Sequence, residues 1–399
     1  MSAAALAALP RDGRLLLLTR FTRLFAYGAL SVVLVLYLTG LGLSAPHIGL
    51  LLTLTLVGDT VVSLWLSTRA DRIGRRRMLI AGAALMAAAG VVFALTHNFV
   101  VLVIAGTIGV ISPSGNEVGP FLPIEQAMLA HVVPSEQRTA VFAWYTLTGA
   151  FATALGALCA GVVSQWLPYR AVVVLYAAVG LLLALGFTRL SSGAEVATPT
   201  ASTLLGLGRS RTVVLKLAAL FSLDSFAGGF VVQGFAAYWF YLRFGVDPAT
   251  LGGIFFGANV LAGISALVAS RLAARFGLVR TMVFTHLPSN VLLILVPLMP
   301  SLPLAVLMLF LRFSISQMDV PTRQSYLMAV VAPEERSAAG GITGVARTIG
   351  AALAPVFAGL LFARPALIDV PFYIAGTLKI VYDLLLFRGF ASEGRPSLA

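Results

Sequence analysis

Ionisable side chains lie inside long apolar stretches of this 399-residue chain. A charge in hydrocarbon is costly, so each such group must face a water-filled cavity or a partner of opposite charge. A group in that position can bind a solute or carry a proton. The candidates for proton coupling or for a cavity wall are Asp59, Glu117, Asp224, Arg312, Asp319 and Arg347.

Asp59 lies near the centre of its apolar stretch. Thr55, Asp59 and Ser63 are spaced i, i+4 and i+8, which places them on one helix face as a polar stripe pointing inward. Asp59 in that position suits a group that loads and releases a proton. The alternative is a static carboxylate that bonds to neighbouring helices.

Glu117 sits in the segment "SPSGNEVGP", whose glycines and prolines predict a distorted helix with carbonyl groups free to face a cavity. The glutamate is either a solute or proton site or a structural carboxylate at the distortion. Glu125 lies nearer the end of the same helix, where we expect it to meet water or Arg138.

The predicted tenth helix is the most polar. One face carries, at spacings i, i+4, i+7 and i+11, Arg312, Ser316, Asp319 and Arg323. This face is either a cavity wall or an ion-pair network, and it allows Asp319 to pair with Arg323. Arg347, in the next helix, would hold an anionic solute or pair with Asp319 or Asp224.

Four more polar positions in the second half of the chain are candidates for a role. Lys379 and Asp383 are one helical turn apart, which predicts a structural ion pair between them. His286 is either a group that titrates near neutral pH or a satisfied polar contact, and a lone histidine is more often the second. Asp224 belongs to the cytoplasmic half of its helix, at a cavity or a gate.

The composition predicts the elements that hold these residues. The chain is 59% hydrophobic with a mean hydropathy of +0.97, as expected of an integral membrane protein. A spanning helix needs about 20 apolar residues. The apolar stretches therefore predict twelve helices, centred near Leu30, Thr55, Ala87, Ile111, Ala152, Val179, Phe230, Asn259, Leu292, Ser316, Ile349 and Thr377.

Cations at the ends of these helices predict the orientation. Most of them, including Arg20, Arg23 and Arg323, fall on one side if both termini are cytoplasmic. The other side keeps only Arg170, Arg243 and Arg364. The net charge of +12 does not indicate nucleic acid, because the cations border apolar runs rather than forming a stripe among aromatic residues.

The two halves of the chain resemble each other. At an offset of about 198, Pro123 and Gln126 in "PIEQAMLAHVVPSEQRTAVF" fall on Pro321 and Gln324 in "PTRQSYLMAVVAPEERSAAG". "ADRIGRRRM" from Ala70 is echoed more weakly by "AARFGLVRTM". These repeats predict two six-helix bundles, residues 1–189 and 213–399, joined by a Ser- and Thr-rich cytoplasmic linker, residues 190–212.

The segment between the second and third helices resembles the signature of the major facilitator superfamily. That pattern is a small residue, three others, and then Asp-Arg-x-Gly-Arg followed by two basic residues. The matching positions are Ser67, Asp71, Arg72, Gly74, Arg75 and Arg76, followed by Arg77. The fifth helix, "TGAFATALGALCAG", lacks the proline of the antiporter subgroup.

The resemblance implies an all-α membrane fold of twelve helices in two pseudo-symmetric bundles. It implies a secondary transporter of a small organic solute that works by alternating access, with proton-coupled efflux as the expected mode. The alternative is a facilitator or proton symporter for a polar or anionic solute. The signature loop would latch the two halves on the cytoplasmic side.

The sequence also indicates which cofactors, partners and location to expect. No phosphate-binding loop and no His or Cys cluster is present in the sequence, so we expect neither an enzyme nor a protein with a cofactor or metal. The family resemblance favours a monomer. The expected location is the inner membrane of a bacterium, with small-molecule solute, protons and lipid as partners.

Overall fold

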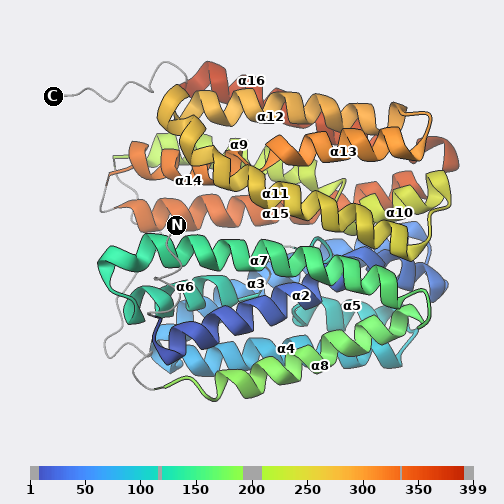
Figure 1. The fold of residues 1–399 in the computed structure, drawn as a ribbon, viewed down its shortest axis with the longest axis horizontal. Coiled ribbons are helices and arrows are strands. Elements are labelled where there is room, and N and C mark those ends of the chain that lie inside the picture. The colour runs from blue at the N-terminus through green and yellow to red at the C-terminus, as the bar shows by residue number, and fades with distance from the viewer. Residues whose placement is uncertain (1–8, 116–118, 192–208, 333–334, 391–399) are drawn as a thin grey trace. The chain divides into compact units, whose positions relative to one another are not determined.

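The computed structural model describes residues 9–115, 119–191, 209–332 and 335–390, except the side chains of residues 68, 71, 72, 135–140, 143, 270 and 337. Every regular element within these residues is a helix. The helices form two compact units (Figure 1), one of residues 1–200 and 233–256 and the other of residues 201–232 and 257–399.

The first unit contains α2 (Arg11–Gly40), α3 (Ala45–Ile73), α4 (Arg75–Leu95), α5 (Phe99–Ile108), α6 (Phe121–Val132), α7 (Ser135–Val163), α8 (Tyr169–Phe187) and α10 (Gln233–Phe244). Helix α11 (Pro248–Phe276) begins in the first unit and ends in the second. The second unit also contains α9 (Arg211–Gly229), α12 (Leu278–Leu295), α13 (Leu302–Ser316), α14 (Asp319–Val330), α15 (Arg336–Phe362) and α16 (Val370–Phe390). Two short 3₁₀ helices are η2 (Val296–Leu298) and η4 (Pro365–Leu367).

Helix α10 belongs with the first unit because it packs against α2. The side-chain amide of Gln233 donates a hydrogen bond of 2.9 Å to the hydroxyl of Ser31. The sequence-based domain boundaries, 1–189 and 213–399, stay a prediction, and most of the expected linker lies outside the described residues.

Eleven helical segments among the described residues are long and apolar enough to span a membrane. The fourth predicted span is different, because α5 covers 10 residues, roughly 15 Å of helix, about half the thickness of a hydrocarbon core. Helices α5 and α6 together therefore supply this span, which completes the predicted set of twelve.

The fourth span is interrupted between α5 and α6. Gly115 and Gly119 adopt φ of 70° and 77°, a left-handed conformation that residues with a Cβ atom rarely adopt. The predicted distortion of this helix is therefore confirmed on both sides of Glu117, which itself lies outside the described residues. Breaks at residues 230–232 and 317–318 interrupt the seventh and tenth spans in the same way.

The internal repeat is visible in the helix boundaries. Helices α6 and α14 each have 12 residues, and the offset of 198 takes Phe121 to Asp319. Helices α3 and α11 each have 29 residues, and each ends at a glycine of positive φ, Gly74 (111°) or Gly277 (85°). The predicted pseudo-symmetry of the two halves is confirmed.

Two close helix crossings repeat as well. A Cβ atom on Gly28 of α2 would lie 2.1 Å from the carbonyl oxygen of Thr153 in α7. A Cβ atom on Gly229 of α9 would lie 2.5 Å from the carbonyl oxygen of Ala351 in α15. An offset of 201 relates the two glycines, and both crossings bring helix backbones into direct contact.

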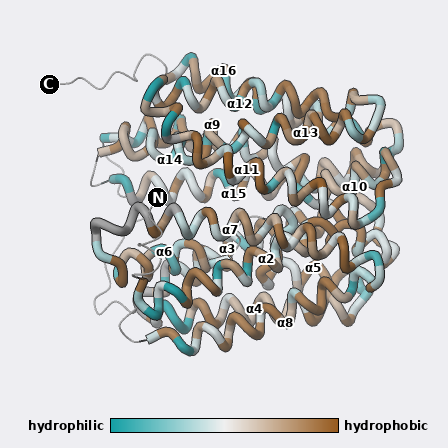
Figure 2. Tube along the Cα trace, in the orientation of Figure 1, coloured by the Kyte–Doolittle hydropathy of each residue, from teal (hydrophilic) through white to brown (hydrophobic). Residues whose placement is uncertain are grey.

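Hydrophilic residues concentrate at helix ends and in loops, whereas the residues along the helices are mainly hydrophobic (Figure 2). On α8, Leu181, Leu182 and Leu185 are between 57% and 65% exposed. A surface of this kind is unfavourable in water, so it belongs in contact with lipid.

Substitution of Gly28 by Ala tests the α2–α7 crossing. The new methyl group overlaps the backbone of Thr153, so we expect a loss of about 1–3 kcal/mol in stability and a lower melting temperature in detergent. Gly40→Ala in the same helix is the control, because a Cβ atom there would have no atom within 4 Å. Equal melting temperatures for the two variants would show that the crossing is not tightly packed.

Candidate functional site

A fully buried ion pair lies in the first unit. Arg23 of α2 donates hydrogen bonds of 2.7 and 2.9 Å from its two terminal nitrogens to the two carboxylate oxygens of Glu125 in α6. Both side chains are 0% exposed. The hydroxyl of Tyr145 in α7 also donates to Glu125, and the guanidinium of Arg23 lies over the ring of Phe121. Three helices therefore meet at one carboxylate.

Sequence reasoning placed these residues elsewhere. Arg23 was expected among the cations at the cytoplasmic side, and Glu125 was expected to meet water or Arg138, but the structure buries the two side chains against each other. The reason is that α2 starts at Arg11, so Arg23 lies three turns into the helix on the face that packs against α6. Arg20 is buried in the same way and donates to the carbonyl oxygen of Tyr145.

Asp59 lies on the inward face of α3, as its spacing predicted, and is 5% exposed. Its carboxylate accepts a hydrogen bond of 2.6 Å from the backbone N–H of Gly119 and a longer one of 3.4 Å from the hydroxyl of Ser63. Thr55, one turn earlier, is fully buried. Asp59 therefore fixes the backbone at the end of the break that contains Glu117.

The signature loop is a one-residue turn. Helix α3 ends at Ile73 and α4 begins at Arg75, so Gly74 alone reverses the chain, as its type predicted. The hydroxyl of Ser67 donates to the carbonyl oxygen of Leu64 within α3. Arg76 donates a hydrogen bond of 3.2 Å to the carbonyl oxygen of Leu190, just after α8. The side chains of Asp71 and Arg72 lie outside the described residues.

A larger ionic cluster lies in the second unit. The carboxylate of Asp224 in α9 meets the ammonium of Lys379 at 2.6 Å and the guanidinium of Arg323 at 3.2 Å. Arg323 also pairs with Asp319 at 3.1 Å, which confirms the predicted pair within α14. All four side chains are less than a tenth exposed.

His286 of α12 connects a second carboxylate to this cluster. Its Nδ1 atom lies 2.8 Å from Asp383 of α16, and its Nε2 atom lies 3.8 Å from Asp224. The amide of Asn290 donates a hydrogen bond of 2.9 Å to the other oxygen of Asp383. The structure thus places His286, for which the sequence favoured a simple polar contact, between two buried carboxylates.

The predicted ion pair between Lys379 and Asp383 is not formed. Lys379 contacts Asp224 instead, and Asp383 contacts His286 and Asn290. The two residues do share one face of α16, but that face packs against both α9 and α12. Partners on neighbouring helices, which sequence spacing does not reveal, therefore displace the pair within the helix.

Arg312 and Arg347 have no such partners. Both are half-buried, and the Nε atom of each is buried without a hydrogen bond. Among the described side chains, neither guanidinium lies within 4.0 Å of a carboxylate oxygen, although both interact electrostatically with Asp224 and Asp319. The expected pairing of Arg347 with one of these acids is therefore not formed. The break at residues 317–318 places Arg312 on α13 and Asp319 on α14, so the predicted polar face is divided between two helices.

The two units carry the same ion pair with the signs exchanged. An offset of 201 takes Arg23 to Asp224, and the offset of 198 takes Glu125 to Arg323. Each pair joins the first and fourth spans of its half. An alignment of the two halves pairs Arg23 with Asp224 and Glu125 with Arg323. From this alignment the sequence alone could have indicated that Arg23 and Glu125 are buried.

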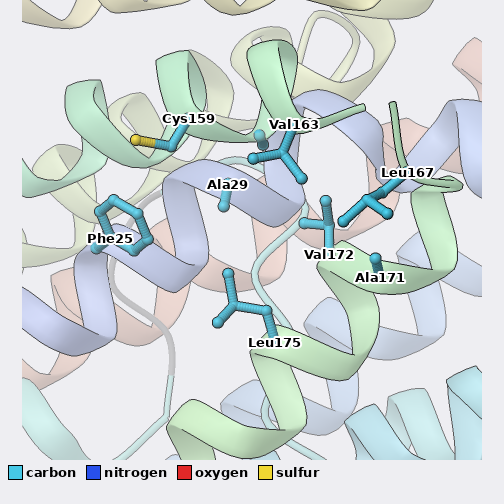
Figure 3. Close-up of a pocket in the computed structure, with 9 residues that line it drawn as sticks. Phe25, Ala29, Cys159, Val163, Leu167, Ala171, Val172 and Leu175 are labelled. Carbon is cyan, nitrogen blue, oxygen red and sulfur yellow. The ribbon is translucent and has the colours of Figure 1, made fainter. Parts of the chain in front are cut away.

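The cavities on the surfaces of the units are separate from these charges. A largely apolar one of about 190 Å³ lies between α2, α7 and α8, where Phe25, Cys159 and Leu175 line it (Figure 3). Another of about 610 Å³ lies between α11, α12 and α16. The described residues contain no group of three or more His, Cys, Asp or Glu side chains placed to hold a metal ion.

These features define a multi-pass membrane protein built from two repeated helical units with charged groups in their interiors. The sequence profile of the Major Facilitator Superfamily matches residues 16–315 and 218–397. The chain therefore belongs to the major facilitator superfamily. It is a transporter that works by alternating access, and not an enzyme.

Individual relatives agree with this assignment. The chain is 33% identical to an uncharacterized membrane protein of Saccharomyces cerevisiae over an alignment of 418 residues. This alignment covers 94% of this chain and 93% of the relative. It is 31% identical over 117 residues to the quinolone resistance protein NorA of Staphylococcus aureus, a match that covers 29% of each chain.

Solved structures show the same fold. The nucleoside transporter NupG superposes with a TM-score of 0.72 at 14% identity, covering 96% of this chain and 99% of that one. A D-xylose-proton symporter superposes with a TM-score of 0.73 at 16% identity, covering 94% and 97%. These likenesses establish the twelve-helix fold, and their low identities carry no information about the solute.

The ion pair between Arg23 and Glu125 can be tested by exchange of its charges. Glu125→Gln removes the carboxylate that the buried arginine faces, so we expect a loss of about 3–5 kcal/mol and a low yield of folded protein. The double variant Arg23→Glu with Glu125→Arg should recover much of the melting temperature, because the second unit accepts the reversed polarity at the equivalent positions. Arg189→Gln, at an exposed position of the same unit, is the control. No recovery in the double variant would contradict the equivalence.

Proposed function

We propose that this transporter couples the export of a small organic solute to the movement of protons. The observation that carries the proposal is the contact between His286 and Asp383, which are 5% and 1% exposed. Imidazole ordinarily changes its charge near neutral pH. A carboxylate and an imidazole in contact can therefore share one proton and pass it on while they remain buried.

The surroundings of this pair connect the proton to the rest of the second unit. A protonated His286 would be a cation 3.8 Å from Asp224, where it would compete with Lys379 for the carboxylate. Asn290 and the ring of Tyr382 also contact the pair, and Arg323 contacts the same carboxylate of Asp224. Uptake of a proton would thus weaken the link between α9 and α16, and its release would restore that link.

Asp59 and Glu117 are the proton candidates of the first unit. Asp59 supports the proposal because it bonds to the backbone of Gly119, so its protonation would loosen the broken fourth span. Glu117 remains a candidate on its position in the sequence alone.

The outward direction and the location are further parts of the proposal. The partial likeness to NorA, a resistance protein by its name, supports export. The distribution of cations supports cytoplasmic termini, and we propose a monomer in the plasma membrane of a bacterium. The signature loop from Ser67 to Arg76 would latch the two bundles on the cytoplasmic side, as the family resemblance implies.

Proteoliposomes with and without an imposed pH gradient test the coupling, with a panel of solutes used first to find one that is transported. His286→Gln and Asp383→Asn should reduce gradient-driven flux to the rate without a gradient, while exchange of solute between the two sides persists. His131→Gln, at an exposed histidine, is the control. Full gradient-driven flux in both variants would contradict a proton site at this pair, and its loss only in Asp59→Asn or Glu117→Gln would move the site to the first unit.

A facilitator or proton symporter for an anionic solute is the second candidate, and Arg312 and Arg347 favour it. The centre of the second unit holds three carboxylates, Asp224, Asp319 and Asp383, and four permanent cations, these two arginines with Arg323 and Lys379. An unpaired cation inside a membrane protein attracts an anion. A solute with a carboxylate or phosphate group would supply the missing hydrogen-bond acceptors.

Arg312→Gln and Arg347→Gln test this second candidate. Each should weaken the binding of an anionic solute about tenfold or more, because each loses a charge-assisted hydrogen bond. The melting temperature should stay equal or rise, because a half-buried charge that has no carboxylate partner among the described side chains is removed. Arg388→Gln, at an exposed position of α16, is the control. Unchanged affinity in both variants, measured by concentration dependence of uptake, would eliminate the anion site.

A further inference from the structure

A groove of about 610 Å³ lies on the second unit where α11 ends, α12 begins and α16 ends. Its walls are apolar, with Leu272 and Phe276 from α11, Phe284 from α12 and Phe387 from α16. Phe276 and Phe284 are 54% and 62% exposed, and the rings of Phe284 and Phe387 meet edge to face at 5.6 Å between centroids. These rings form a pocket that is open to the surroundings of the helix bundle.

The groove also has polar lining residues. Arg280 and the threonines Thr281 and Thr285 line it in the first two turns of α12. Arg280 is exposed, and it makes no ion pair with any side chain that the structure describes. Arg271 and Arg275, near the end of α11, are also exposed, so three arginines surround the turn at Gly277.

The position of the groove in the membrane follows from the helix ends. Helices α11, α12 and α16 are candidate membrane spans, and the arginines lie where two of them are joined. Such a place is the boundary between hydrocarbon and the lipid headgroups. Basic pockets between spanning helices at this depth bind the headgroups of acidic lipids.

We propose that this groove binds one anionic phospholipid. Its phosphate would accept hydrogen bonds from Arg280, and its acyl chains would lie along Phe284 and Phe387. A phospholipid fits both parts of the groove, because it is the one abundant ligand in a bilayer that joins a negative group to long apolar chains. A soluble anion would leave the aromatic walls uncovered, and a zwitterionic lipid would bring the positive part of its headgroup close to three arginines.

The bound lipid would act on the turn between α11 and α12. This turn is the repeat equivalent of the signature loop, with Gly277 at the position of Gly74, but it lacks the aspartate of that loop, since Ala274 replaces Asp71. A lipid phosphate at Arg280 would supply a negative charge at this turn. The proposal does not depend on the coupling ion or on the direction of transport.

Purified protein in phosphatidylcholine nanodiscs provides the test, with phosphatidylglycerol added in steps and the melting temperature as the readout. We expect phosphatidylglycerol to raise the melting temperature in a saturable way. Arg280→Gln should weaken the apparent affinity about fivefold, as expected for one cation near an anionic headgroup. Phe284→Ser should weaken it too, by removing an apolar wall.

Arg211→Gln is the matched control, because Arg211 is exposed at the start of α9 and does not line the groove. Its affinity for phosphatidylglycerol should equal that of the unchanged protein. Equal weakening in Arg280→Gln and Arg211→Gln would mean general attraction of basic residues to the bilayer and would overturn the proposal. The same rise in melting temperature with glycerophosphate in place of the lipid would identify a site for a free anion and would overturn it as well.

Discussion

Exclusion of water from the interior of each unit is the constraint on which the arrangement of its polar residues depends. A buried ion without a counter-ion is strongly destabilising, so helices that carry ions pack where those ions can meet. In the first unit this brings α2 and α6 together through Arg23 and Glu125. In the second unit it brings α9, α14 and α16 together through Asp224, which contacts both Arg323 and Lys379. Close glycine crossings then hold the neighbouring helices in place.

The buried charges are balanced more completely in the first unit than in the second. In the first, the pair formed by Arg23 and Glu125 is compact and neutral, with the tyrosine hydroxyl as an additional donor. In the second, two arginines have no carboxylate partner among the described side chains, and a histidine lies between two acids. A neutral ion pair favours a fixed structure, whereas a centre with an excess of cations can respond to a proton or an anion. Our functional proposals therefore rest on the second unit.

Most of the fold could be predicted from the sequence, because it depends on local patterns. Apolar run lengths indicated the spans, the glycines around Glu117 indicated the broken fourth span, and the repeat indicated the pseudo-symmetry. The pairing of charges was harder, since it depends on how each helix is rotated and on which helix lies beside it. Asp319 and Arg323, on one short helix, were paired correctly. Lys379 and Asp383 were not, because their partners lie about 90 to 160 residues away.

The exchanged signs of the two equivalent ion pairs have a consequence for assembly in the membrane. Duplicated helices are similar enough to be mistaken for one another while the chain is being inserted. If α14 took the place of α6 beside α2, Arg323 would approach Arg23, and the reverse error would bring Glu125 to Asp224. Like charges in a dry interior repel strongly, so either wrong partner is rejected. The inverted polarity therefore favours packing of each of these helices within its own half of the chain.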